Sequence, residues 1–144
     1  NYSRVVSEPY FLALNVNNPL SIQKNLTVND LHNIDFIMYD AVVGRYSFEL
    51  LSSLFLNSGV KPNFVQYVSQ PSVFLGLVKA SLGVALLASS SRQNSPENVI
   101  FKEIKLPEWV RADVYLATKK EPKNKLIPEV YNYIMEALYK DQKI

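Results

Sequence analysis

The stretch Val73-Phe-Leu-Gly-Leu-Val-Lys-Ala-Ser-Leu-Gly-Val-Ala-Leu-Leu87 begins with the pattern of an amphipathic helix and ends with that of a buried strand, which makes it the strongest indication of how the chain folds. Leu75, Leu77 and Val78 can share one helical face, and Val84–Leu87 is a short, unbroken apolar run of the kind that parallel sheets bury on both faces. We expect Gly83 to let the backbone turn between the two elements. The stretch is therefore one helix-to-strand step of an α/β sheet.

The residues in front of this helix supply its start. Ser69-Gln-Pro-Ser72 offers a hydroxyl that can cap free amide groups, followed by a proline in the first turn, where its missing N–H costs little. The helix N-terminus then lies next to the end of the preceding strand, Phe64–Val68. In an open α/β sheet, small ligands bind at such a place, because backbone N–H groups point out of the helix there.

The other strands and helices are predicted from apolar runs and helical periodicity. Right-handed crossovers between successive strands then require a parallel sheet with helices on both faces. The polar loop Ser89–Pro96 is a composition break, beyond which two extended segments and a last helix follow. Before the opening stretch we expect strand Tyr10–Leu14, which begins at Glu8-Pro9, and a helical turn Val28–His32, which Thr27 caps with an acidic residue three positions later. Strand Asp35–Tyr39 follows, then a helix that carries Phe48, Leu51, Leu54 and Phe55 and stops at Asn57-Ser-Gly59, and then strand Phe64–Val68. After the opening stretch we expect extended segments Val99–Ile104 and Val110–Ala117 and helix Ile127–Tyr139.

Composition excludes several classes of protein. The 144 residues are 48% hydrophobic and 19% charged, which is typical of one globular core or two small lobes. A net charge of +2 without a basic stripe argues against nucleic-acid contact by this chain, and Lys119–Lys125 is interpreted as a solvated loop. Disulfides and thiolate metal sites are excluded because there is no cysteine, and no apolar run approaches the roughly 20 residues of a membrane span. We expect a soluble, cytoplasmic protein, although a secreted protein that has lost its signal would look the same.

Catalytic motifs give no support to an enzyme. The single histidine, His32, lies in a short polar turn without an obvious acid partner, so it is interpreted as a surface residue. Ser21-Ile-Gln-Lys24 matches the SxxK pattern of serine acylases, but the companion signatures are missing. There is no GxGxxG or P-loop, and the acidic residues are scattered rather than clustered as metal ligands. We therefore expect no catalysis, no cofactor and no metal.

The order of elements resembles the effector-binding domain of LysR-type transcriptional regulators. Each matching piece is weak alone, and their order and spacing carry the resemblance. Two departures stand out: Ser81 lies where the family favours glycine, and Ala88 lies where it favours proline after the strand. The matching pieces are Glu8-Pro-Tyr-Phe-Leu-Ala-Leu with Asn18-Pro-Leu-Ser21, Val28-Asn-Asp-Leu31 before Asp35-Phe-Ile, Gly59-Val-Lys-Pro62 before Phe64-Val-Gln, and Leu77-Val-Lys-Ala-Ser-Leu-Gly-Val-Ala-Leu-Leu87.

The resemblance implies a type II periplasmic-binding-protein-like α/β fold, in which two Rossmann-like lobes are joined by crossover strands. It implies one Rossmann-like lobe with a mostly parallel sheet plus part of a second lobe. Residues 1–14 would be a crossover strand and remnant of lobe I, residues 15–98 the complete lobe II, and residues 99–144 the returning strands and C-terminal helix of lobe I. We expect an N-terminally truncated domain that exposes an apolar surface and forms a homo-oligomer.

The expected effector site lies where strand carboxyl ends and helix N-termini converge. The amides near Ser69 to Ser72 would suit an anion such as a carboxylate, and look-alike regulators often bind small carboxylates, amino acids or aromatic acids. Asp40 argues the other way, so either it points to solvent or the effector carries a cationic or hydroxyl group. The alternative for each position is structural, with Tyr39 and Gln66 as half-buried strand residues and Ser69 as a helix cap. The predicted effector-binding residues are Tyr39, Asp40, Ala41, Gln66, Val68, Ser69 and Ser72.

The expected function is therefore effector sensing in a bacterial LysR-type regulator, with a small metabolite bound in the interlobe cleft to modulate DNA-dependent transcription. DNA contact would belong to a winged helix-turn-helix domain absent from this chain. Two alternatives stay open. The same fold serves solute-binding proteins of transport systems, and a ligand-free α/β dimerisation module would also fit the pattern.

Overall fold

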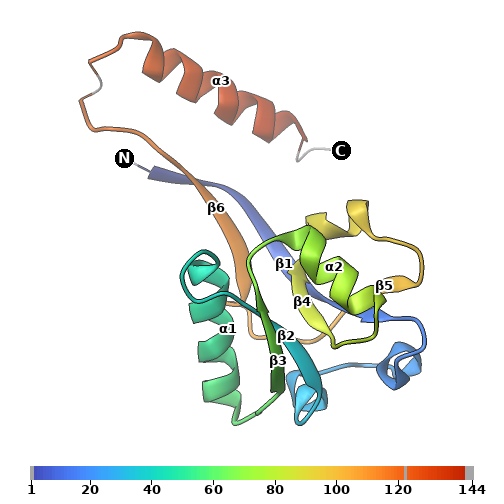
Figure 1. Cartoon of the computed structure of the whole chain (residues 1–144). Coiled ribbons are helices and arrows are strands. Elements are labelled where there is room, and N and C mark those ends of the chain that lie inside the picture. The colour runs from blue at the N-terminus through green and yellow to red at the C-terminus, as the bar shows by residue number, and fades with distance from the viewer. Residues whose placement is uncertain (1, 122, 142–144) are drawn as a thin grey trace. The chain divides into compact units, whose positions relative to one another are not determined.

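The computed structural model describes residues 2–121 and 123–141. The chain forms two compact units, Glu8–Ala112 and a smaller one made of Asn1–Ser7 with Asp113–Ile144. The predicted lobe limits at residues 14 and 98 stay a prediction. The elements are β1 (Tyr2–Asn15), the 3₁₀ helices η1 (Pro19–Ile22) and η2 (Val28–Leu31), β2 (Asp35–Tyr39), α1 (Arg45–Ser58), β3 (Asn63–Val68), α2 (Pro71–Lys79), β4 (Ala85–Ala88), the 3₁₀ helix η3 (Ser89–Asn94), β5 (Val99–Lys102), β6 (Arg111–Ala117) and α3 (Leu126–Asp141) (Figure 1).

The strands of the larger unit run in both senses. β2 and β3 are parallel, and an isolated parallel bridge between Phe36 and Val84 joins β2 to the chain just before β4. β1 instead pairs antiparallel with both β4 and β5. The prediction of parallel strands is therefore correct for β2, β3 and the chain just before β4, which helices connect. It is wrong for β1, whose neighbours β4 and β5 are both antiparallel to it. No crossover helix links β1 directly to β4, so nothing requires those two strands to be parallel.

Helices cover both faces of these strands, as the sequence predicts. On β1, Leu12 and Leu14 lie in one buried cluster and Ala13 lies in a second one, because successive residues of a strand point to opposite faces. The first cluster contains Leu51, Leu54 and Phe55 of α1, and the second contains Phe74, Leu75 and Val78 of α2. The apolar periodicity of the two helices is thus what fixes their positions over the sheet.

Most predicted elements are confirmed to within a few residues. β2 coincides with the expected strand Asp35–Tyr39, and α1 ends at Ser58, directly before Gly59, whose φ of 68° is the left-handed conformation that glycine adopts without penalty. The Thr27–Asp30 capping box is present, with the N–H of Thr27 donating to Asp30 Oδ2 at 2.7 Å. The start of β1 is wrong in the prediction, because the strand begins at Tyr2 and continues through Pro9. Pro9 lies just before Tyr10, the first residue that pairs with β4.

The two ends of α2 differ from the prediction. The helix begins with Pro71 as expected, but its N-cap residue is Gln70 rather than Ser69, and no side chain caps it. At the other end the left-handed residue is Ser81, with φ of 59°, and not Gly83. The N–H of Ser81 donates to the carbonyl of Val78 at 3.0 Å and that of Leu82 to the carbonyl of Leu77 at 3.1 Å, which together form a Schellman motif.

Gly83 has a different role, because the backbone passes close to β2 at this residue. A Cβ added there would lie 2.9 Å from the carbonyl oxygen of Asp35 and 3.2 Å from Cγ1 of Ile37. The N–H of Val84 donates to the same Asp35 carbonyl at 2.9 Å. Glycine is thus required for a close approach between strands rather than for a turn.

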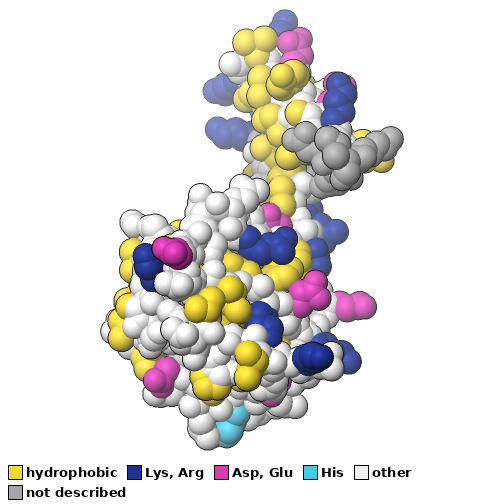
Figure 2. Space-filling model, turned by 90° about the vertical axis from the view of Figure 1, so that its right-hand side faces the viewer, with side chains coloured by type: hydrophobic (Ala, Val, Ile, Leu, Met, Phe, Trp, Pro, Cys, Tyr) yellow, Lys and Arg dark blue, Asp and Glu magenta, His cyan; other side chains and the backbone are white. Residues whose placement is uncertain are grey.

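The smaller unit combines α3 with the pairing of β6 and β1. Tyr2 and Tyr115 make an edge-to-face ring contact. Nη1 of Arg4 lies 3.7 Å from Oδ2 of Asp113 and forms an ion pair with it. None of the described residues of this unit is fully buried. Figure 2 accordingly shows hydrophobic side chains of this unit at its surface. No helix within residues 2–121 and 123–141 has the length and hydrophobicity that crossing a membrane requires.

Candidate functional site

The carboxyl ends of β2 and β3 lie side by side and bring several predicted effector-binding residues together. Tyr39 and Val68 are paired in the parallel ladder, and the N–H of Asp40 donates to the carbonyl of Val68 at 2.9 Å. Ala41 follows in the exposed loop that leads to α1, and α2 begins three residues after Val68. The two strand ends meet at the same edge of the sheet because β2 and β3 are parallel, and effector binding at this edge stays a prediction.

Tyr39 is engaged with the protein interior. Its hydroxyl donates to the carbonyl of Leu86 at 3.0 Å, and its ring centroid lies 4.7 Å from that of Phe74. Burial raises the pKa of the Tyr39 phenol above its ordinary value, so the side chain is neutral at physiological pH. These contacts match the alternative reading of Tyr39 as a half-buried strand residue.

Asp40 binds its own loop through one carboxylate oxygen. Oδ1 accepts the N–H groups of Val43 and Val42, each at 2.9 Å. These two backbone hydrogen bonds lower the pKa of Asp40, the larger effect coming from Val43. The carboxylate is therefore ionised and holds the loop in front of α1.

The N-terminus of α2 keeps polar groups at the surface. Ser69 and Ser72 are exposed, and so is Gln66 on β3, whereas Val68 is buried. Val73 and Phe74 donate their N–H groups back to the carbonyl of Gln70 at 3.1 and 3.3 Å. Within residues 2–121 and 123–141, neither the N–H nor the hydroxyl of Ser72 has a hydrogen-bond partner. The first turn of α2 therefore leaves hydrogen-bond donors at the surface, and the role of Ser72 in effector binding stays a prediction.

A cavity of about 620 Å³ opens between α2 and the segment that follows β4. Ser72 is the one predicted residue that lines it. The other polar lining residues were missed, because in the sequence the stretch Ser89–Pro96 carries only the signal of a polar loop. The lining consists of Pro71, Ser72, Leu75, Gly76, Lys79, Ser90, Ser91, Gln93, Asn94 and Pro96.

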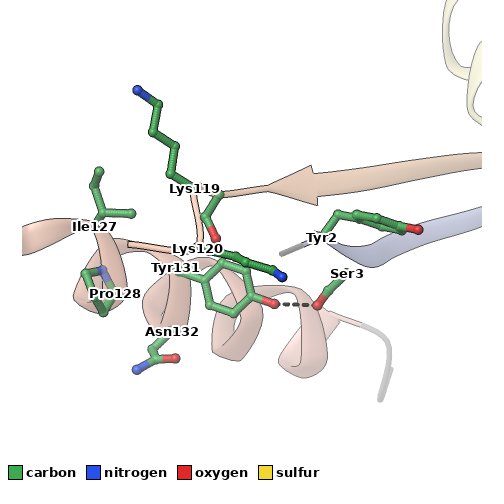
Figure 3. A pocket seen from close by; sticks show the side chains of 9 residues that line it. Tyr2, Ser3, Lys119, Lys120, Ile127, Pro128, Tyr131 and Asn132 are labelled. Atoms are coloured by element: carbon green, nitrogen blue, oxygen red, sulfur yellow. Dashed lines mark hydrogen bonds between the residues drawn. The ribbon is translucent and has the colours of Figure 1, made fainter. Parts of the chain in front are cut away.

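A cavity of about 730 Å³ lies in the smaller unit (Figure 3). Tyr131 and Ser3 are joined across it by a hydrogen bond between their hydroxyl groups, and Lys119 points away from that bond. None of the predicted effector-binding residues lines this cavity. Since no described residue of the unit is fully buried, its walls lack the packed support of the α2 cavity, and we prefer the latter as a ligand site.

The remaining candidate chemistry is structural. His32 is exposed, and its Nδ1 accepts the N–H of Lys61 at 3.1 Å. Ser21 donates its hydroxyl to the carbonyl of Val16 at 2.9 Å. Among the described residues, no group of three or more His, Cys, Asp or Glu side chains is placed to hold a metal ion.

Comparison with known proteins identifies the family. The family model described as LysR substrate binding domain matches residues 1–138. A curated relative, the Hca operon transcriptional activator HcaR of Escherichia coli (strain K12), is 27% identical over 104 residues, covering 72% of this chain and 35% of the relative. The chain spans 33–40% of the length of the curated relatives that it matches.

Solved structures share the fold. The BenM effector-binding domain with its effector benzoate has a TM-score of 0.82 at 19% identity, covering 99% of this chain and 64% of that chain. The effector-binding domain of QuiR in complex with shikimate has a TM-score of 0.81 at 19% identity, covering 97% of this chain and 66% of that chain. The type II periplasmic-binding-protein-like fold class expected from the sequence is thereby confirmed. The chain belongs to the LysR substrate-binding domain family.

Proposed function

We propose that this chain is the effector-sensing domain of a cytoplasmic LysR-type transcriptional regulator and binds a small carboxylate without catalysing a reaction. The observation that carries the proposal is the position of α2, which begins directly after β3 with Ser69 and Ser72 exposed beside the end of β2. Membership of the LysR substrate-binding domain family supports it, and so do the effectors named for two similar structures, benzoate and shikimate, which are both carboxylic acids.

The local chemistry favours an anion at this edge. The N-terminus of α2 carries about half a positive elementary charge from the aligned peptide dipoles, and the N–H of Ser72 has no protein partner within the described residues. The hydroxyls of Ser69 and Ser72 add two hydrogen-bond donors. Asp40 does not require a cationic effector, because Oδ1 already accepts the N–H groups of Val42 and Val43.

Sensing requires that the effector binds one conformation of the regulator more tightly than another. Occupancy then shifts the population toward that conformation, and a homo-oligomer transmits the shift to its subunits. We assign DNA contact to a part of the regulator other than this chain, which has a net charge of only +2.

Calorimetric titration of the purified protein with small carboxylates, including benzoate and shikimate, tests the proposal. We expect at least one of them to bind and to raise the melting temperature, since a ligand that binds only the native state stabilises it. The double variant Ser69→Ala, Ser72→Ala removes two hydroxyl donors, and each hydrogen bond to a charged group is worth about 1.5–3 kcal/mol. Affinity should therefore fall at least tenfold.

The matched control is Ser53→Ala, which removes an exposed hydroxyl from α1 and should leave the affinity unchanged. Binding that is equally strong in the double variant would exclude the α2 N-terminus as the site. No binding of any carboxylate to the wild-type protein would refute the proposed function.

A further inference from the structure

Gly76 lies in the middle of α2, where glycine is the least favourable residue after proline. Packing does not explain its presence, because a Cβ added at Gly76 would meet nothing within 4 Å apart from its chain neighbours and the backbone of its own helix. Gly76 instead lines the cavity between α2 and η3, which follows β4 and is drawn in gold beside α2 in Figure 1. The missing side chain therefore keeps this groove open.

The side chains around Gly76 are hydrogen-bonding groups that the protein itself leaves free. Within the described residues, Ser72, Ser91, Gln93 and Asn94 have side chains without a protein hydrogen-bond partner, and all four line the cavity. Two hydroxyls and two amides provide both donors and acceptors. The apolar part of the lining is supplied by Pro71, Leu75 and Pro96. Such a mixture suits a small molecule with several hydroxyl groups.

The charge of the groove is positive. Lys79, in the last turn of α2, is the only charged side chain in the lining, and it makes no ion pair within the described residues. Glu8 of β1 binds Ser90 of the lining: its Oε2 accepts the hydroxyl of Ser90 at 2.9 Å and the N–H of Ser90 at 3.4 Å. Glu8 does not line the cavity. One ammonium group without an opposing carboxylate indicates a ligand that carries a negative charge.

We propose that the groove between α2 and η3 binds a hydroxylated carboxylate, with the carboxylate at the N-terminus of α2 beside Ser72, the ammonium group of Lys79 adding positive charge to the same groove, and Ser91, Gln93 and Asn94 binding the hydroxyl groups. The inference rests on the proposed function, because Ser72 belongs to both sites, and it specifies the chemical class of the effector. A volume of about 620 Å³ lies within the range of small-molecule pockets.

Gly76→Gln tests the groove, because glutamine is a good helix former and adds a long side chain at a position that lines the cavity. The variant should fold with a melting temperature at or above the wild-type value, since no protein atom obstructs the new Cβ. We expect shikimate, used as the hydroxylated probe together with gluconate and citrate, to bind the wild-type protein and to bind Gly76→Gln at least tenfold more weakly. Ser53→Gln, at an exposed position of α1, is the matched control and should bind as the wild type does.

Two further measurements examine the ligand class. Benzoate has a carboxylate but no hydroxyl groups, so it should bind the wild-type protein at least tenfold more weakly than the best hydroxylated probe. Lys79→Gln should weaken binding of that probe at least tenfold, whereas Lys61→Gln, which removes an exposed lysine elsewhere, should not.

The outcomes separate this inference from the proposed function. If carboxylates bind and Ser69→Ala, Ser72→Ala weakens them while Gly76→Gln does not, the groove is excluded and the proposed function stands. Benzoate binding as tightly as every hydroxylated probe would overturn the assigned ligand class. If the wild-type protein binds none of these acids, both the proposed function and the assignment of the groove are refuted.

Discussion

Replacing Ser81 with glycine should stabilise the protein. Ser81 occupies the left-handed position of the Schellman motif that ends α2, with φ of 59°. For a residue with a Cβ this conformation costs about 1–2 kcal/mol, because the Cβ approaches the following carbonyl oxygen. The side chain of Ser81 is exposed and has no hydrogen-bond partner within the described residues, so the substitution removes no contact.

The net gain is smaller than this strain, because glycine also gives the unfolded chain more conformational freedom. That freedom cancels about 0.5–1 kcal/mol of the relieved backbone strain. The expected net stabilisation by Ser81→Gly is therefore about 0.5–1 kcal/mol. For a chain of this length the melting temperature should rise by about 1–4 °C.

Urea denaturation measures the effect, with an increase in the midpoint at unchanged slope as the expected result. Ser53→Gly is the matched control, because it makes the same chemical change at an exposed position inside α1, where glycine is unfavourable. That variant should lose about 0.5 kcal/mol of stability. Opposite signs for one substitution at two positions would identify backbone conformation as the cause. A neutral or destabilising Ser81→Gly, with Ser53→Gly behaving as expected, would refute the reasoning.

Gly83→Ala should lower the free energy of unfolding by about 1–3 kcal/mol, since the new Cβ would lie 2.9 Å from the carbonyl oxygen of Asp35; a urea midpoint equal to the wild-type value would contradict this. Lys102→Met should cost about 1–3 kcal/mol in the same assay, because Lys102 Nζ donates to three backbone carbonyls of residues 20, 21 and 23, and an unchanged midpoint would show that these bonds contribute nothing. The Thr27 N–H holds the pKa of Asp30 below its ordinary value, so its contribution to stability is present above about pH 4 and is lost as the pH falls further. Asp30→Asn should therefore reduce the loss of melting temperature between pH 6 and pH 3, and an identical loss in both proteins would refute the capping contribution.

The elements that local sequence specifies were predicted well. The end of α1 just before Gly59, the limits of β2 and the Thr27–Asp30 capping box depend on neighbouring residues alone, and the structure confirms all three. The prediction for the end of α2 was wrong, because the residue with positive φ is Ser81 and the nearby glycine, Gly83, has another role. A left-handed residue can be serine, as at Ser81, and a glycine can be required by a strand that is distant in sequence, as at Gly83.

The predicted site shows the same division. The sequence located the edge of the sheet, because strand ends and helix starts can be read from patterning. The sequence does not reveal that the Tyr39 hydroxyl donates to the carbonyl of Leu86 or that Asp40 accepts an N–H group of its own loop, since these partners depend on the folded backbone. The groove lined by Gly76 and Lys79 was also beyond it, because η3 reaches α2 only in three dimensions.

Periodicity, turn residues and motif spacing are properties of the chain, so the α/β class, the family and the order of the elements can be inferred without a structure. The antiparallel pairing of β1, the close approach at Gly83 and the set of polar side chains without a protein partner become visible only in the folded molecule. Strand partners and hydrogen-bond partners distant in sequence are selected by the burial of both faces of the sheet, and burial is a property of the whole fold.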